Sequence, residues 1–235
     1  MTFRLGRQEF EFGSGRLFSA SETLNVRRSF DGFRASGQAG AWTFHSILAK
    51  PAETNRGVFD DVPDHSQTLW GAGAIHPVPR LSGGNISIYY IGFGRREGRF
   101  QSGSGRELRH TMGSRFFGKA GAAEYNYELV CQWGSFGDGR IRAWAVATDS
   151  SYVFSKLLFS LQPGVRFDAA SGNRNPQGNI LGSFNPLFPG TAYSGKIGLL
   201  GPTNIIDVVP TLRFKPPQTR DGAGRVGHVL APEYQ

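Results

Sequence analysis

Arginine is the residue type whose number and spacing in this sequence indicate a chemistry. The 235-residue chain has 21 Arg but only 5 Lys, and Lys and Arg together exceed Asp and Glu by 26 to 18. Arg is favoured over Lys where an anion is held in a fixed, bidentate contact. The excess therefore predicts arginines that pair with carboxylates or that face an anionic ligand.

These arginines fall on the polar faces of candidate β-strands, together with acidic residues. If the faces line a channel, the arginines would favour anions and the carboxylates would brace them. The alternative is the solvated face of a soluble sheet laced with cross-strand ion pairs. The cationic positions are Arg7, Arg109, Arg115, Arg140, Arg142, Arg166 and Arg213, and the acidic ones are Glu9, Glu107, Glu128, Asp168 and Asp207.

Enzyme chemistry finds little support in the sequence. The five histidines lie in different segments, without an HExxH pairing, a GxSxG nucleophile motif or a P-loop. No run of Lys and Arg exceeds two residues, which argues against a nucleic-acid-binding arm. We therefore expect no catalytic residues, no cofactor and no nucleic-acid partner.

A metal site and a reactive thiol are also weakly indicated. Asp60, Asp61, Asp64 and His65 could bind a divalent cation, but their spacing does not match an EF-hand and solvated acids are common in loops. Cys131 lies on an apolar strand face, where a small hydrophobic role is expected. We assign no metal site.

The elements that would position the arginines are long strands. Residues of alternating polarity are separated by Gly-rich turns, whereas helical periodicity is interrupted by Gly or Pro. Ordinary strands average about 5–6 residues, whereas strands that cross a membrane need about 9–11. The candidate strands are 2–12, 28–37, 40–50, 66–76, 84–96, 105–119, 122–135, 139–153, 157–170, 192–200 and 203–215.

Alternation along these strands predicts which side chains share a face. By itself it leaves a soluble β-sandwich and a membrane barrel equally open, because both alternate. In a curved membrane sheet the polar set would be concave and the apolar set would face lipid. The predicted concave set is Arg109, Arg115, Arg142, Arg166 and Arg213, and the predicted convex set is Tyr127, Leu129, Trp133, Phe167, Leu212 and Phe214.

Turn residues divide the connections into short and long ones. Tight turns are expected at 38–39, 118–121 and 137–139, and longer loops at 51–65, 97–104 and 171–191. Short turns on one side and long loops on the other are typical of bacterial barrels. We expect one β-domain over 2–215 and a disordered tail over 216–235, where Pro, Gly and Arg dominate.

Several short motifs, in order through about residues 2–214, resemble those of the alginate export family of outer-membrane porins. They include Leu5-Gly6-Arg7-Gln8-Glu9-Phe10, Arg27-Arg28-Ser29-Phe30-Asp31-Gly32-Phe33-Arg34, Gly105-Arg106-Glu107-Leu108-Arg109-His110, Ile141-Arg142-Ala143-Trp144, Phe184-Asn185-Pro186-Leu187-Phe188-Pro189 and Gly201-Pro202-Thr203-Asn204-Ile205-Ile206-Asp207. The resemblance implies a large antiparallel barrel in the bacterial outer membrane that passes an anionic polyuronate. It also implies that Arg7, Glu9, Arg109 and Arg142 line the pore.

Two features distinguish this sequence from the family pattern. Residues 1–12 contain no apolar leader, and eleven candidate strands cannot close an even-stranded barrel. We therefore expect a curved, open partial barrel whose remaining strands are missing from this chain. The expected function is an outer-membrane channel segment for alginate-like polyuronates or other organic anions. The alternatives are a soluble β-sandwich that binds or cleaves acidic glycans and a non-functional truncated fragment.

Overall fold

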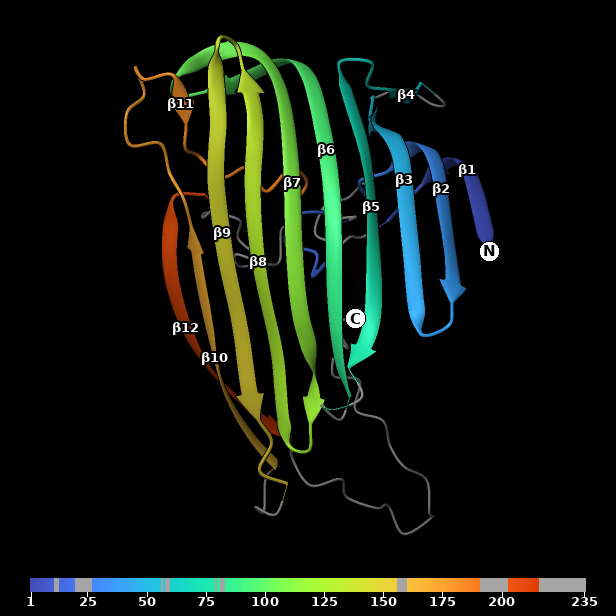
Figure 1. Ribbon diagram of the computed structural model, residues 1–235, viewed down its shortest axis with the longest axis vertical. Coiled ribbons are helices and arrows are strands. Elements are labelled where there is room, and N and C mark those ends of the chain that lie inside the picture. Colours follow the sequence, from blue (N-terminus) through green and yellow to red (C-terminus); the bar gives the residue numbers. More distant parts are fainter. Residues whose placement is uncertain are drawn as a thin grey trace.

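The structure is a computed structural model, and the elements of secondary structure in its described residues are β-strands (Figure 1). The residues that it describes are 1–10, 13–19, 27–55, 57, 60–78, 80, 83–155, 160–190 and 203–215. The predicted strand 192–200 and the predicted tail 216–235 lie outside these residues. Within them, no helix is long and apolar enough to span a membrane.

Strands that follow one another in sequence lie side by side in one sheet (Figure 1). The order is β1-β2-β3-β5-β6-β7-β8-β9-β10-β12; the short β4 pairs with β3, and β11 pairs with β9. The predicted antiparallel meander is confirmed. The strands are β1 (Thr2–Gln8), β2 (Phe30–Ala39), β3 (Trp42–Glu53), β4 (Val62–Pro63), β5 (Gln67–Val78), β6 (Gly84–Phe100), β7 (Gly103–Ala120), β8 (Ala123–Phe136), β9 (Gly139–Tyr152), β10 (Ser160–Ala170), β11 (Ile180–Leu181) and β12 (Ile205–Lys215).

The sheet is curved but it is not closed. Strands β1 and β12 are its two edges, and they lie at opposite sides of the sheet in Figure 1. Because the described strands form one sheet, the alternative of two packed sheets in a β-sandwich is wrong. The open, curved sheet agrees with the expectation of a partial barrel.

The central strands are the longest ones. Strand β7 has 18 residues and β6 has 17, while β8 and β9 have 14 each. A strand needs about 9–11 residues to cross a bilayer at the usual tilt. The central strands are therefore long enough to cross a bilayer and to extend beyond it.

The connections differ between the two ends of the sheet. At the lower end in Figure 1, β2–β3 and β7–β8 are joined by two-residue turns at 40–41 and 121–122. At the upper end, the connections 9–29, 54–66 and 171–204 are long, but 101–102 and 137–138 are tight turns. The predicted loop 97–104 is therefore wrong. A register shift between Arg95 and Gly98 absorbs the irregular spacing, and the β6–β7 hairpin continues to Phe100 opposite Gly103.

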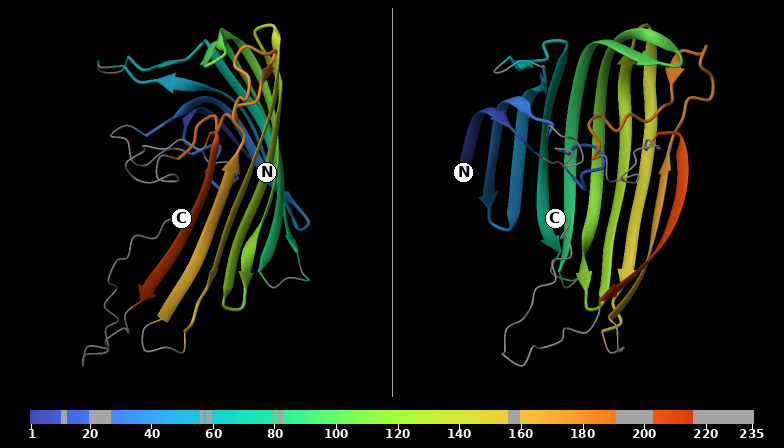
Figure 2. Two further views of the ribbon diagram at one scale, coloured as in Figure 1. Left: turned by 90° about the vertical axis from the view of Figure 1, so that its left-hand side faces the viewer. Right: turned by 180° about the vertical axis from the view of Figure 1, so that it is seen from behind.

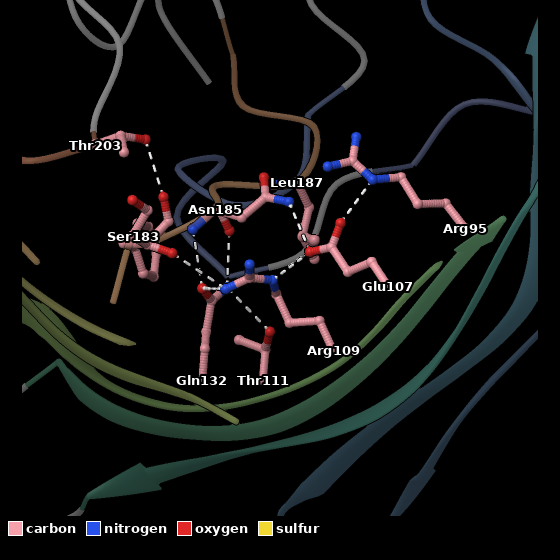
Figure 3. Close-up of polar contacts among 10 residues, drawn as sticks. Arg95, Glu107, Arg109, Thr111, Gln132, Ser183, Asn185, Leu187 and Thr203 are labelled. Atoms are coloured by element: carbon pink, nitrogen blue, oxygen red, sulfur yellow. Dashed lines mark hydrogen bonds and ion pairs between the residues drawn. The ribbon is translucent and has the colours of Figure 1, made fainter. Parts of the chain in front are cut away.

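The two faces of the sheet are chemically different. In β7, Arg109 and Thr111 on one face are fully shielded from solvent, whereas Met112 on the other face is 52% exposed. The shielded face is concave and curves around segments 13–19 and 180–190, as Figures 2 and 3 show. We call these two segments the inner segments, and the two sides of the sheet the concave and the convex face.

Candidate functional site on the concave face

A buried ion cluster lies on the concave face of β6 and β7 (Figure 3). Arg109 Nε donates to Glu107 Oε1 at 2.6 Å, and Arg95 Nε donates to Glu107 Oε2, also at 2.6 Å. The Glu107 and Arg109 side chains are 0% exposed, and Arg95 is 25% exposed. Alternation in β7 places Glu107 and Arg109 on the same face, and the register sets Arg95 directly opposite Glu107.

This cluster attaches the second inner segment to the sheet. Arg109 Nη1 donates to Gln132 Oε1 at 2.8 Å and to the Ser183 carbonyl at 3.3 Å. Gln132 in turn donates to the Asn185 carbonyl at 2.7 Å and accepts from the Asn185 amide at 2.9 Å. Arg109 is therefore held in fixed contacts with the chain itself. Its Nη2 atom is buried and has no hydrogen-bond partner among the described residues.

A second cluster attaches the first inner segment. The Glu128 carboxylate accepts hydrogen bonds from Tyr89 Oη, at 2.6 Å, and from Ser14 Oγ. Arg16 lies 3.6 Å from Glu128 and 3.9 Å from Asp168, so it bridges strands β8 and β10. A single arginine of the inner segment thus contacts carboxylates from two strands of the sheet.

The second cluster continues toward the edge strand β12. Arg166 Nε lies 3.2 Å from Asp168, and Arg166 Nη2 lies 3.6 Å from Asp207. On β7, which lies on the side of β8 away from β12, Arg115 donates to Asn126 at 2.7 Å and to the Gly13 carbonyl at 2.8 Å. The concave face therefore carries paired charges on β8, β10 and β12, and Arg115 of β7 is hydrogen-bonded beside them.

The inner segments also pack against each other. Ser19 donates to the Phe188 carbonyl and Phe188 donates to the Leu17 carbonyl, each at 2.9 Å. Phe18 stacks on Phe10 with ring centroids 4.7 Å apart. Arg28 donates to the Pro189 carbonyl at 3.3 Å, and burial lowers the pKa of Arg28. The concave side thus holds an apolar core as well as ion pairs, formed by Phe10, Leu17, Phe18, Phe30, Phe93, Phe184 and Phe188.

The structure places most of the predicted site residues on the concave face. The paired positions across β7, β8, β10 and β12 bring these residues to one side of the sheet. The register does not by itself test whether they line a pore. The residues so placed are Arg109, Arg115, Glu128, Arg166, Asp168 and Arg213.

The predicted positions of Arg142 and Arg7 are wrong. Arg142 lies opposite Trp133 on the convex face, because its neighbours Ile141 and Ala143 take the buried concave positions. Arg7 lies opposite Asp31 and binds it at 2.7 Å, and Phe30, next to Asp31, occupies the buried side. The face of a strand that carries an arginine is therefore not always the concave face.

Glu9 is not part of a strand. Strand β1 ends at Gln8, and the exposed Glu9 carboxylate lies 3.1 Å from Arg27 Nη1. The expectation that Glu9 shares a strand face with Arg7 is therefore wrong.

Sequence reasoning missed the residues that the inner segments contribute. Arg16 lies in a loop, so it has no strand parity by which to place it. A signal was available in Gly13-Ser14-Gly15-Arg16, a flexible stretch before the apolar Leu17 and Phe18, and in the Phe-rich stretch 184–188. Long loops with large apolar residues must bury them somewhere, and the concave face is where they are buried.

The acidic loop forms hydrogen bonds within itself. Asp64 accepts from Ser66 N at 2.7 Å, from Ser66 Oγ at 2.6 Å and from Gln67 Nε2 at 2.5 Å. Asp61 binds Arg7 and the Asn55 amide. Among the described residues, no group of three His, Cys, Asp or Glu is arranged to hold a metal ion.

The convex face exposes large apolar side chains. Leu129 is 50% exposed, Leu212 is 54% exposed and Phe214 is 61% exposed. The predicted convex set is confirmed in full, and Cys131 is exposed on the same face. Exposed apolar side chains that gather on one face of a sheet mark contact with lipid or with another protein.

A comparison with protein families identifies the chain. The sequence model of a family described as alginate export matches residues 1–228. The chain belongs to the alginate export family. No curated protein sequence matches it.

Membership of the alginate export family implies the role of an outer-membrane porin that exports alginate. Proteins of this family transport a substrate and are not enzymes, and the family implies a location in the bacterial outer membrane. The all-β antiparallel sheet is consistent with a porin of the alginate export family.

Proposed function

We propose that this protein forms part of a channel through which an alginate-like polyuronate, or a similar organic anion, crosses the outer membrane. The concave face would line the passage and the convex face would contact lipid. Transport would be passive, guided by fixed charges, and would need no cofactor.

The observation that supports this proposal is the separation of chemistry between the two faces. Buried ion pairs gather on the concave side, beside the apolar core that the inner segments complete, whereas large apolar side chains are exposed on the convex side. In a soluble sheet with one exposed face, the apolar side would be the one shielded from solvent. A polar interior and an apolar exterior are the arrangement of a transmembrane barrel.

The two charge clusters are close to balanced. They contain the cations Arg16, Arg95, Arg109, Arg115 and Arg166 and the carboxylates of Glu107, Glu128, Asp168 and Asp207. We infer that the clusters hold the inner segments in place and that concave arginines outside them favour anions. Arg213 is such a residue, because it is exposed on the concave face of β12. A polyuronate has a carboxylate on each sugar, which a guanidinium binds in a bidentate manner.

The open edges indicate that further strands take part. Backbone N–H and C=O groups along β1 and β12 need hydrogen-bond partners inside a bilayer. We infer that strands outside the described residues pair with these edges and complete the barrel.

Measurement of ion selectivity tests the proposal. In planar bilayers under a salt gradient, Arg213→Glu should lower the anion/cation permeability ratio, and Lys50→Glu should leave it unchanged. Lys50 is the matched control because it lies opposite Asp31 on the convex face. The difference should shrink in high salt, since charges are screened over about 8 Å at physiological ionic strength. An equal ratio in wild type and Arg213→Glu, or no conductance from folded wild type, would contradict the proposal.

A further inference from the structure

Four arginines lie at the upper end of the central strands, three of them at convex positions of the register and Arg96 within the register shift between Arg95 and Gly98. They are Arg96 in β6, Arg106 in β7, and Arg140 and Arg142 in β9. All four side chains are exposed. Arg142 lies opposite Trp133 and Arg140 opposite Ser135, so both belong to the face that carries the exposed apolar residues. We call these residues the convex arginine band.

The band differs from the arginines of the concave clusters in having no side-chain partner among the described residues. None of its four members forms an ion pair or a side-chain hydrogen bond within the part of the chain that the structure describes. The nearby acid Glu97 is paired with Arg99, and Asp138 lies in the β8–β9 turn. A row of exposed, unpaired guanidinium groups carries a net positive charge that an external anion can neutralise.

The band begins at the level of an aromatic row. The register aligns Trp70, Gly92, His110, Trp133 and Arg142 on five neighbouring strands. The His110 and Trp133 rings stack with centroids 5.7 Å apart. Trp and Tyr gather at the level of lipid headgroups in membrane proteins. Arg142 is therefore at headgroup level, and Arg140 lies about 7 Å further out along the strand.

A cavity adjoins the band. It has a volume of about 950 Å³, and Arg142, Trp144, Asn173, Arg174, Asn175 and Asn179 are among its lining residues. The connection from β10 to β11, which contributes Asn173, Arg174 and Asn175 to the lining, runs beside the upper part of β9 (Figure 1). A Trp ring with amide side chains is suited to a sugar ring, while two arginines are suited to phosphate.

We propose that the convex arginine band and this cavity bind the phosphorylated sugar headgroup of a membrane glycolipid. The long connections at the same end of the sheet are typical of the external side of a barrel, so the bound lipid belongs to the outer leaflet. The proposal rests on the membrane location in the proposed function, but it does not depend on what is transported.

Binding of defined lipids tests the proposal. Folded protein in detergent would be titrated with diphosphoryl lipid A, with its dephosphorylated form and with phosphatidylglycerol, and bound lipid counted by native mass spectrometry. Diphosphoryl lipid A should bind tightest, and added salt should weaken it. Equal binding of the dephosphorylated form would overturn the phosphate contact. Equal binding of phosphatidylglycerol would overturn the assignment to a sugar headgroup.

Paired variants locate the site. R140Q/R142Q should weaken diphosphoryl lipid A binding about 25-fold, since each arginine near a lipid surface contributes about fivefold. R4Q/R34Q is the matched control, because Arg4 and Arg34 lie opposite each other on the concave face. Equal weakening in both variants would contradict the proposal. Heat-dependent gel mobility shows whether R140Q/R142Q folds. If it does not fold, the binding of the three lipids to the wild-type protein still tests the proposal.

The two proposals can fail separately. A wild-type protein that conducts anions but shows no preference for diphosphoryl lipid A would overturn this inference alone. A protein that prefers this lipid but shows no anion selectivity would overturn the proposed function alone.

Discussion

Glu107 and Arg109 lie two residues apart on β7, with 2.6 Å between Arg109 Nε and Glu107 Oε1, and neither side chain is exposed to solvent. Both also hold other parts of the chain: Glu107 binds Arg95, and Arg109 binds the Ser183 carbonyl. A buried charge that loses its partner is strongly destabilising. The pair therefore links the stability of the sheet to the position of the inner segment.

Glu107→Gln should destabilise the folded protein by about 3 kcal/mol, because two arginines lose their shared carboxylate in a shielded environment. Urea unfolding in detergent, followed by gel mobility, measures the change. Glu97→Gln is the control, since the Glu97–Arg99 pair is largely exposed and exposed pairs contribute little. Similar unfolding midpoints for the two variants would show that the buried pair is not a major source of stability.

Gln132→Leu should loosen the second inner segment, because it removes the hydrogen bonds to Arg109 and to the Asn185 backbone. In the proposed channel this would raise single-channel conductance, which planar bilayers measure directly. Gln162→Leu is the matched control, since Gln162 binds Glu124 and Ser151, away from the inner segments. Unchanged conductance in Gln132→Leu would indicate that the second inner segment does not obstruct the passage.

Gly92→Ala should destabilise the sheet by about 1–3 kcal/mol through overpacking. The Trp70 ring lies over Gly92, and a Cβ at this position would be 2.0 Å from Trp70 Cε2. Gly94→Ala provides the control two residues along the same strand, where the nearest atom would be at 3.9 Å. Thermal unfolding of both variants gives the comparison, and equal midpoints would show that Trp70 moves away without cost.

The loop before β5 should become less stable in acid. Burial of Asp64 raises the pKa of its carboxyl group, but the hydrogen bonds from Ser66 and Gln67 outweigh burial and lower the pKa overall. A pKa that is lower in the folded state stabilises the fold above the unfolded value of about 3.9, and this contribution is lost as the pH falls below it.

Hydrogen exchange at the Ser66 amide measures this effect. Exchange protection should fall below about pH 4 in wild type, and Asp64→Asn should remove the acid dependence. Asp138→Asn, in the exposed β8–β9 turn, should leave the acid dependence of Ser66 exchange unchanged. An identical pH profile for wild type and Asp64→Asn would show that the Asp64 carboxylate does not cause the acid dependence.

The face of the sheet to which a side chain points can be predicted from the sequence where polar and apolar residues alternate strictly. In β7 and β8 the alternation correctly predicts that Arg109, Arg115 and Glu128 lie on one face of the sheet and that Leu129 and Trp133 lie on the other face. This works because a strand turns successive side chains to opposite faces. The same rule holds in β9, but the concave residues Ile141, Ala143 and Ala145 are apolar, since they pack beneath the inner segments.

What could not be predicted depends on contacts between distant parts of the chain. Taking arginine as a marker of the polar side predicts a concave Arg142, whereas Ile141 and Ala143 occupy the concave side of β9 in the structure. The Phe18–Phe188 contact joins two loops that have no periodicity to read. Long-range packing of this kind leaves no signal in local sequence patterns.

The pairing of the two inner segments has a consequence for the order of folding. Each hairpin of the sheet joins residues that are near in sequence, so strands can add one after another with little loss of chain entropy. The first inner segment meets the second one only after most of the chain has been synthesised and both are free to approach. We therefore expect the sheet to form first around an empty interior, and Phe18 and Phe188 to be among the last residues to reach their final environment.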